Sequence, residues 1–426
     1  MVSKIDRSEV STKNHGWQVT FAGMGINLAL GILYTWSVIS KSIPASWNWS
    51  EADKSWPYSI ACIVFSIIMV LAGRLQDKIG PRIVAIIGGL LVGVGFIIAS
   101  FSTSPLGYMI GFGLFAGAGI GFGYASATPP AVKWFPAAKT GLIAGIVVSG
   151  FGLASVYAAP LANWLTTAYG IHNMVLILGI IFLIVVIALA QILRPPAANY
   201  VPAARNQGKS RSGVSQSAPS EARDFTPKEM LGTRQFYMLW FMYACGAGAG
   251  LMVIAKLATI AKIQANIELG FLLVAVLAIG NGSGRVMAGM LSDKLGRKYT
   301  MLFCFILQAV LILLLSLSKP DSLLARVPVL ALSSALIGAM YGANLSLFPS
   351  VTKDFYGLKH FGINYGLIFT AWGVGGFMLS LLVGSLYDKY HTFVFAYYGA
   401  SILLVLAAIM VIFLKPPGQS LVPRRA

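Results

Sequence analysis

Twelve long runs of apolar residues limit what this chain can fold into. A helix needs about 20 such residues to cross the hydrocarbon core of a bilayer, and only 10% of the 426 residues are charged. A soluble domain carries about 25% charged residues. The sequence therefore predicts an all-α membrane protein with twelve transmembrane helices, at about residues 17–40, 54–73, 83–102, 106–129, 141–163, 172–193, 235–258, 269–291, 300–318, 327–349, 362–386 and 392–414.

A segment of different composition separates the sixth run from the seventh. It is rich in Pro, Ala, Ser and basic residues, a composition that cannot bury a core and is typical of a flexible linker. We therefore expect a tail at 1–16, a six-helix bundle at 17–194, this linker at 195–233, a second six-helix bundle at 234–414 and a tail at 415–426.

Two short segments carry local signals of their own. Pro227 follows Thr226, and because Pro is favoured in the first turn of a helix, a short surface helix is expected at 226–230. The end of the chain, at residues 421–424, reads Leu-Val-Pro-Arg and resembles a protease site left over from protein expression. This end is left out of the fold prediction.

Basic residues gather on one side of the predicted spans. With the amino terminus in the cytoplasm, 23 of the 31 Lys and Arg residues face the cytoplasm and six face outward. This bias is typical of cytoplasmic loops, so we expect an inner (plasma) membrane protein with both termini and the linker in the cytoplasm. The same scatter through short loops explains the net charge of +18 without a nucleic-acid partner.

The two predicted bundles repeat one motif. The pattern G-x-x-x-D-K-x-G-(x)-R follows the second run, at 73–82, and the eighth run, at 289–298. An internal repeat joined by a linker is the plan of a transporter whose halves rock about a central site. An Asp and an Arg in each copy could latch the cytoplasmic ends, although a basic loop serving topology alone is the alternative. The candidate gate residues are Asp77, Arg82, Asp293 and Arg297.

Arg285 places a permanent charge inside the eighth run. It lies two helical turns, about 12 Å, before Asp293, and a charge at that depth marks a functional site. No Asp or Glu lies deep in any run, so we expect an anionic ligand to pair with its planar guanidinium. Asn281, one turn earlier on the same face, could hydrogen-bond the ligand or a neighbouring helix.

Two lysines lie near the outer end of the seventh run. We expect Lys256 and Lys262 to extend along the helix so that their ammonium groups reach the headgroups. The alternative is an electropositive mouth that attracts anions.

The remaining reactive side chains form no cluster in the sequence. Cys62, Cys245 and Cys304 lie in apolar runs without metal-ligand or disulfide spacing, and such residues act as small buried side chains. The four His residues lie in tails or loops. We therefore expect no cofactor, no metal and no enzymatic activity.

These features together resemble the major facilitator superfamily over nearly the whole chain. Within it, the chain is similar to the monocarboxylate porters and the bacterial oxalate/formate exchangers. The matching residues are GILYTWS at 31–37, GAGIGFGY at 117–124, Trp134-Phe135-Pro136 with Lys139 and Gly141, Ala144-Gly145, Gly150, Arg285, Phe348-Pro349-Ser350 and Asn364-Tyr365-Gly366.

The resemblance implies two pseudo-symmetric six-helix bundles around a substrate site. Tyr34, Tyr124 and Tyr341 match aromatic positions around the site of the exchangers, where the last is a Trp. Trp372 stands where the exchangers have a Lys that supplies a second positive charge for dianionic oxalate. An uncompensated buried charge costs several kcal/mol, so losing that Lys favours a monocarboxylate such as L-lactate or pyruvate. Trp372 either packs or contacts the ligand.

The expected function is secondary transport by alternating access, in a carrier that the resemblance implies is monomeric. Animal monocarboxylate porters place an Asp one turn before the Arg, where this chain has Asn281. The substrate carboxylate on Arg285 is therefore our candidate proton carrier for proton-coupled symport. Exchange of oxalate-like anions is the alternative. A membrane sensor is disfavoured because the linker is too short for a signalling domain.

Overall fold

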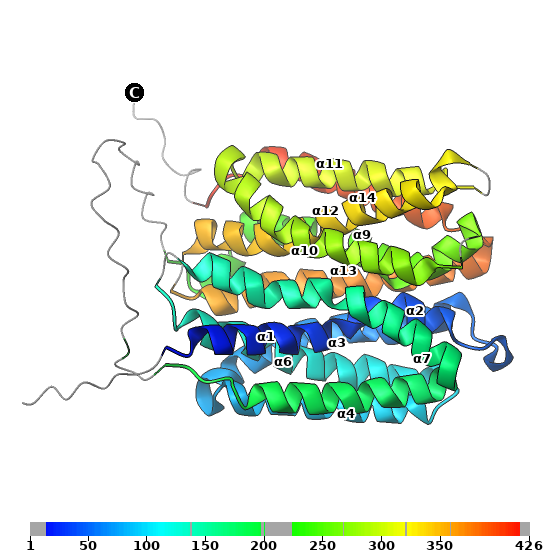
Figure 1. Ribbon diagram of the computed structural model, residues 1–426. Helices are drawn as coiled ribbons and strands as arrows, with labels where there is room; N and C mark the ends of the chain where they lie inside the picture. Colours follow the sequence, from blue (N-terminus) through cyan, green and yellow to red (C-terminus); the bar gives the residue numbers. More distant parts are fainter. Residues whose placement is uncertain are drawn as a thin grey trace, which may run out of the picture.

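The structure is a computed structural model that describes residues 14–136, 139–196, 200, 224–266, 268–319, 322–357 and 359–417. These residues form helices and connecting segments, and no strand occurs among them. The helices lie side by side along one direction, with α4 (Pro81–Ser100) at the lower edge and α11 (Arg297–Leu315) at the upper edge of the view (Figure 1). The predicted all-α class is confirmed.

We call the helices before residue 197 the first half. It contains, besides α4, the elements α1 (Gly16–Leu30), η1 (Gly31–Thr35), α2 (Trp36–Lys41), η2 (Ala45–Trp47), α3 (Glu51–Ile79), α5 (Pro105–Tyr108), η3 (Met109–Ala116), α6 (Gly117–Val132) and α7 (Thr140–Ala190).

The helices after residue 223 make up the second half. It contains, besides α11, the elements α8 (Pro227–Leu231), α9 (Arg234–Ala265), α10 (Gly270–Leu295), η5 (Leu323–Ala325), α12 (Val327–Tyr356), α13 (Phe361–Tyr390) and α14 (Val394–Phe413). The predicted surface helix at 226–230 is confirmed as α8. Its start is fixed by a capping box, in which Thr226 and Glu229 each bond the other's backbone N–H.

Eleven segments of the described chain are long and apolar enough to cross a membrane. One of them, Leu142–Ala190, has 49 residues, which at 1.5 Å per residue is about twice the thickness of a bilayer core. It breaks at Gly170, where φ is 77°, so it supplies two crossings. The eleven segments thus account for the twelve predicted runs.

Both copies of the repeated motif turn the chain in the same way. Gly80 lies between α3 and α4 with φ 86° and ψ 158°, and Gly296 lies between α10 and α11 with φ 89° and ψ 154°. A positive φ is accessible to Gly at little cost, so this glycine lets one span end and the next begin at once. A Cβ added to Gly73 or Gly289, the first glycine of each copy, would have no neighbouring atom within 4 Å.

Several helices run past the predicted apolar runs. The run at 54–73 lies inside α3, which begins at Glu51 and ends at Ile79. The helix begins earlier because Ser50 caps it through the N–H of Asp53. Apolar runs measure the hydrocarbon span, whereas caps set the helix ends. The predicted features of the tail through residue 13, of linker residues 201–223 and of the tail from 418 lie outside the described residues, and the bundle boundaries stay a prediction.

The two halves meet along two helix pairs, α3 with α13 and α7 with α10. At the first seam the backbones approach closely, since a Cβ on Gly373 would overlap the hydroxyl of Ser66. Small residues permit such packing between membrane helices. Each seam joins spans from different halves, so side chains on α10 and α13 can share a site with the first half.

Candidate functional site

Arg285 lies on α10 at the seam with α7, and 6% of it is exposed. Its Nε donates to Asn281 Oδ1 at 3.2 Å, and its Nη1 donates across the seam to the carbonyl of Val148 at 2.8 Å. The protein therefore supplies partners for this arginine even though no acid lies deep in the apolar runs. An amide and a backbone carbonyl, rather than an acid, satisfy two of its donor nitrogens.

Two buried donors next to each other stay without a partner. Arg285 Nη2 and Asn281 Nδ2 make no hydrogen bond to any described residue. They belong to side chains one helical turn apart that already contact each other. Buried donors are normally satisfied, and ordered water or a ligand can supply the bond that the protein does not. Each of these two nitrogens can donate a hydrogen bond to an oxygen atom.

Gly152 on α7 packs directly against the guanidinium of Arg285. A Cβ added there would be 3.2 Å from Arg285 Nε and 3.3 Å from Cζ, closer than comfortable van der Waals contact. The sequence analysis missed this residue because a glycine carries no side-chain chemistry. The only sequence signal for it is that it is a glycine within the apolar run at 141–163.

A chain of hydrogen bonds joins three of the predicted aromatic residues. Tyr34 and Tyr341 hydroxyls lie 2.6 Å apart, and Trp372 Nε1 donates to Tyr341 at 2.8 Å. Tyr34 belongs to η1, where the first span tightens, whereas Tyr341 and Trp372 belong to α12 and α13. The chain therefore crosses between the halves. It also uses the Trp372 N–H, so this indole offers a ligand its ring.

Aromatic rings connect these tyrosines to Tyr124. The Phe151 ring lies 4.9 Å from that of Tyr34 and 5.3 Å from that of Tyr124, and Phe65 touches both Tyr124 and Trp372. The sequence analysis missed both phenylalanines, since apolar residues in apolar runs carry no signal.

The six predicted binding residues thus form one buried region. Arg285 lies close enough to the hydroxyls of Tyr34, Tyr124 and Tyr341 for its charge to act on each of them. Asn281 hydrogen-bonds Arg285 directly, and Trp372 joins the group through Tyr341. Their part in substrate binding stays a prediction.

Lys256 does not reach the headgroups, so that expectation is wrong. It is 1% exposed, and its Nζ donates to the Glu51 carboxylate at 2.6 Å and to the Glu51 carbonyl at 2.9 Å. Glu51 begins α3 in the first half, and a carboxylate so near stabilises the ammonium inside the protein. Lys262 is half exposed and lies 3.4 Å from Glu268.

A second carboxylate joins the halves at the same place. Asp388 of α13 accepts the N–H groups of Glu51 at 2.8 Å and Ala52 at 2.7 Å. These are two of the free N–H groups at the start of α3, so the second half caps a helix of the first. We call Glu51, Lys256 and Asp388 the latch.

Three of the four predicted gate residues pair within their own halves. Arg297 donates to Asp293 at 2.7 Å and to Asp354 at 3.0 Å, all in the second half. Arg82 donates to Gln191 in the first half. The side chain of Asp77 lies outside the described part of the structure. Latching of the halves by these residues stays a prediction.

A family model described as Major Facilitator Superfamily matches residues 19–280 and 249–426. The chain belongs to the Major Facilitator Superfamily. The predicted resemblance to this superfamily and its fold is therefore confirmed, and the chain is a multi-pass membrane protein. A solved structure agrees on the fold, namely a bacterial homologue of the human lysosomal transporter Spinster in an inward-facing, unoccupied conformation. Its TM-score is 0.62 at 15% identity, covering 95% of this chain and 96% of that one.

Two relatives lie in the predicted subgroups. The oxalate:formate antiporter of Oxalobacter formigenes is 27% identical over 365 residues, which are 84% of this chain and 81% of the antiporter. Monocarboxylate transporter 11 of Mus musculus is 27% identical over 286 residues, 66% of this chain and 60% of that protein. Both relatives move solutes across membranes.

Proposed function

We propose that this protein is a secondary transporter of small monocarboxylates such as L-lactate and pyruvate, and that Arg285 binds the carboxylate. The observation that carries the proposal is the pair of unpartnered buried donors, Arg285 Nη2 and Asn281 Nδ2, among the described residues. A carboxylate has two oxygens and takes a charge-assisted hydrogen bond from a guanidinium. The relatives carry carboxylates by name, which supports the same class.

Charge balance favours a monoanion over a dianion. Arg285 is the cation of the site, and Trp372 occupies the position where the exchangers have a lysine. The Trp372 ring packs against the rings of Phe369 and Phe65, with centroids 5.2 Å and 5.0 Å away. A monocarboxylate leaves this region neutral, whereas oxalate leaves one negative charge uncompensated, at several kcal/mol.

The contacts between the halves support alternating access. Arg285 bonds the first half through Val148, and Tyr34 bonds the second half through Tyr341. The latch closes one end, and the distribution of basic residues predicts that this end faces the outside of the cell. Rocking of the halves breaks the latch to open this end and exposes the site to one side at a time.

The hydrogen bonds that Arg285 makes without substrate favour proton-coupled symport. Its contacts with the Val148 carbonyl and the Asn281 amide partly compensate its charge, which lets the empty carrier return. The proton then travels with the substrate carboxylate, because no Asp or Glu lies among the described residues around Arg285. Exchange of anions such as oxalate and formate is the second candidate, because it needs no return of an empty carrier.

Transport in liposomes tests the proposal and separates the two mechanisms. Purified protein is reconstituted, and uptake of radiolabelled L-lactate is measured with an inward proton gradient and empty vesicles. The same uptake is then measured without the gradient but with unlabelled lactate or oxalate inside. Uptake driven by the gradient alone is the expected result and supports symport. Uptake only against internal anion would establish exchange, and no uptake under either condition would refute lactate as a substrate.

A further inference from the structure

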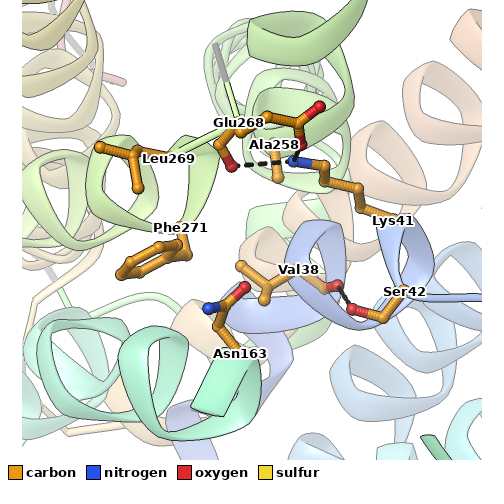
Figure 2. Close-up of a pocket in the computed structure, with 8 residues that line it drawn as sticks. All are labelled: Val38, Lys41, Ser42, Asn163, Ala258, Glu268, Leu269 and Phe271. Atoms are coloured by element: carbon orange, nitrogen blue, oxygen red, sulfur yellow. Dashed lines mark hydrogen bonds and ion pairs between the residues drawn. The ribbon is translucent and has the colours of Figure 1, made fainter. Parts of the chain in front are cut away.

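A cavity of about 340 Å³ lies between the halves, apart from the buried site around Arg285. Its first-half walls come from Val38 and Lys41 of α2 and from Asn163 of α7. Its second-half walls come from Glu268, just before α10, and from Phe271 at the start of α10. Figure 2 shows Lys41 reaching across this cavity to Glu268.

Two lysines from different halves share the carboxylate of Glu268. Lys41 Nζ lies 3.2 Å from Oε2, and Lys262 Nζ lies 3.4 Å from Oε1. The hydrogen bond and charge of Lys41, followed by those of Lys262, lower the pKa of Glu268 below its usual range. Glu268 is therefore ionised at neutral pH, and the three side chains carry a net charge of +1.

We propose that this cavity is a peripheral binding site for small carboxylate anions, with the Glu268 carboxylate as an internal stand-in for the ligand. An arriving carboxylate replaces the Glu268 carboxylate on Lys41 and Lys262. It stays bound there while the outer end is closed. We call these three residues the mouth site. The inference rests on the proposed carboxylate transport and adds a second position for the substrate.

Glu268 is easy to displace because water already surrounds it. Its side chain is 68% exposed and that of Lys262 is 54% exposed, while Lys41 is 20% exposed. Exposed ion pairs are weak and screened by salt, so Glu268 can turn into solvent at little cost. The latch is the opposite case, since Lys256 is 1% exposed. A latch that holds the halves together and a mouth site that exchanges its anion are thus separate devices.

The walls of the cavity select the chemical class of the ligand. Val38, Leu269 and Phe271 supply apolar surface, and Asn163 supplies an amide that points toward the same space (Figure 2). A short alkyl chain can cover the apolar wall while its carboxylate reaches the lysines. A carbonyl or hydroxyl next to the carboxylate can meet the amide. Small 2-oxo and 2-hydroxy monocarboxylates have this shape.

Three single variants test the mouth site by the sign of their effects. Lys41→Gln and Lys262→Gln each lower its net charge from +1 to zero, whereas Glu268→Gln raises it to +2. Uptake of radiolabelled L-lactate into liposomes is measured at low and at saturating concentration. Attraction of anions by charge changes association by tenfold or more. We therefore expect low-concentration uptake to fall about threefold to tenfold in both lysine variants and to rise in Glu268→Gln, with saturated rates unchanged.

A different pattern is expected if Lys41 and Glu268 act only as a salt bridge that holds the halves together. Lys41 and Glu268 belong to different halves, so Lys41→Gln and Glu268→Gln would then act in the same direction, each by breaking one bridge. Lys262 and Glu268 belong to the same half, so Lys262→Gln would have no effect. Either of these results overturns the mouth site.

Salt provides an independent check on the wild type and on Glu268→Gln. The Debye length is about 10 Å at 0.1 M salt and about 3 Å at 1 M, so their low-concentration uptake should converge as salt is raised. If the difference between these two uptake rates is unchanged at high salt, the result would contradict a charge effect. Absence of lactate uptake by the wild type would instead refute the proposed function, so the two failures are distinguishable.

Discussion

Replacing Glu51 with Gln should open the protein at the end closed by the latch. In the closed arrangement, Lys256 is 1% exposed and its Nζ lies 2.6 Å from the Glu51 carboxylate. Gln keeps the shape of Glu but removes the carboxylate that is hydrogen-bonded to the buried ammonium, so the charge of Asp388 alone remains to offset it. Separation of the halves returns Lys256 to water, so the substitution penalises only the closed arrangement.

The size of the effect follows from the geometry of the pair. Removing one partner of a buried ion pair costs about 3–5 kcal/mol. The lower end applies here, because the Glu51 carbonyl still accepts from Lys256 at 2.9 Å and the Gln amide oxygen can accept as well. About 3 kcal/mol corresponds to roughly a hundredfold change in the ratio of closed to open molecules, since each 1.4 kcal/mol is tenfold.

A native cysteine can report this opening. Cys62 of α3 is fully buried at the seam with α13, where a Cβ on Gly376 would lie 3.2 Å from its Sγ. In a background with Cys245→Ala and Cys304→Ala, a membrane-impermeant thiol reagent added from outside reacts with Cys62 when the seam opens. We expect Glu51→Gln to raise the labelling rate by up to about a hundredfold, in proportion to the open population.

Two companion variants make the test decisive. The double variant Glu51→Gln with Lys256→Met buries no unpaired charge, so its labelling rate should return toward that of the parent. Lys54→Met removes a lysine that also bonds Glu51, at 2.8 Å, but is 21% exposed, and it should change labelling little. If Glu51→Gln labels no faster than the parent, or the double variant labels as fast as Glu51→Gln, the charge argument is refuted.

Three further predictions concern the buried site. Arg285→Lys should abolish lactate uptake while leaving the folded protein intact by size-exclusion chromatography, because Lys keeps the charge but loses the planar fork; full uptake would exclude a bidentate role. Trp372→Lys restores a second cation and should give measurable oxalate binding by calorimetry, and undetectable binding would contradict the charge count. Gly152→Ala should crowd the guanidinium, which lies 3.2 Å from the added Cβ, and lower uptake at low lactate concentration about tenfold, as overpacking costs about 1–3 kcal/mol. Gly145→Ala on the same helix meets no atom within 4 Å and should leave uptake unchanged, so equal losses in both alanine variants would point to the helix rather than to Arg285.

The parts of the fold that depend on local sequence could be predicted. Apolar run length gave the spans, and the repeated motif located Gly80 and Gly296, which share one backbone conformation in the structure. Arg285 stood out because a charge in an apolar run is rare. Asn281 could be placed beside it because helical spacing alone sets that distance.

Contacts between distant parts of the chain could not be predicted in this way. Lys256 and Glu51 are 205 residues apart, and Tyr34 and Tyr341 are 307 apart. Their pairing depends on how the halves pack, about which local periodicity carries no information. The expectation for Lys256 failed for this reason, since a lysine near a span end reaches the headgroups only when no buried carboxylate competes for it.

The two N–H groups that Asp388 accepts have a consequence for how opening can be observed. Because their acceptor belongs to the other half, the amides of Glu51 and Ala52 lose their hydrogen bonds each time the halves separate at this end. The Asp53 N–H keeps its bond to Ser50 within the first half. Neighbouring amide protons on one helical turn thus exchange with solvent deuterium at different rates. The exchange rates of the Glu51 and Ala52 amides report how often the halves separate at this end.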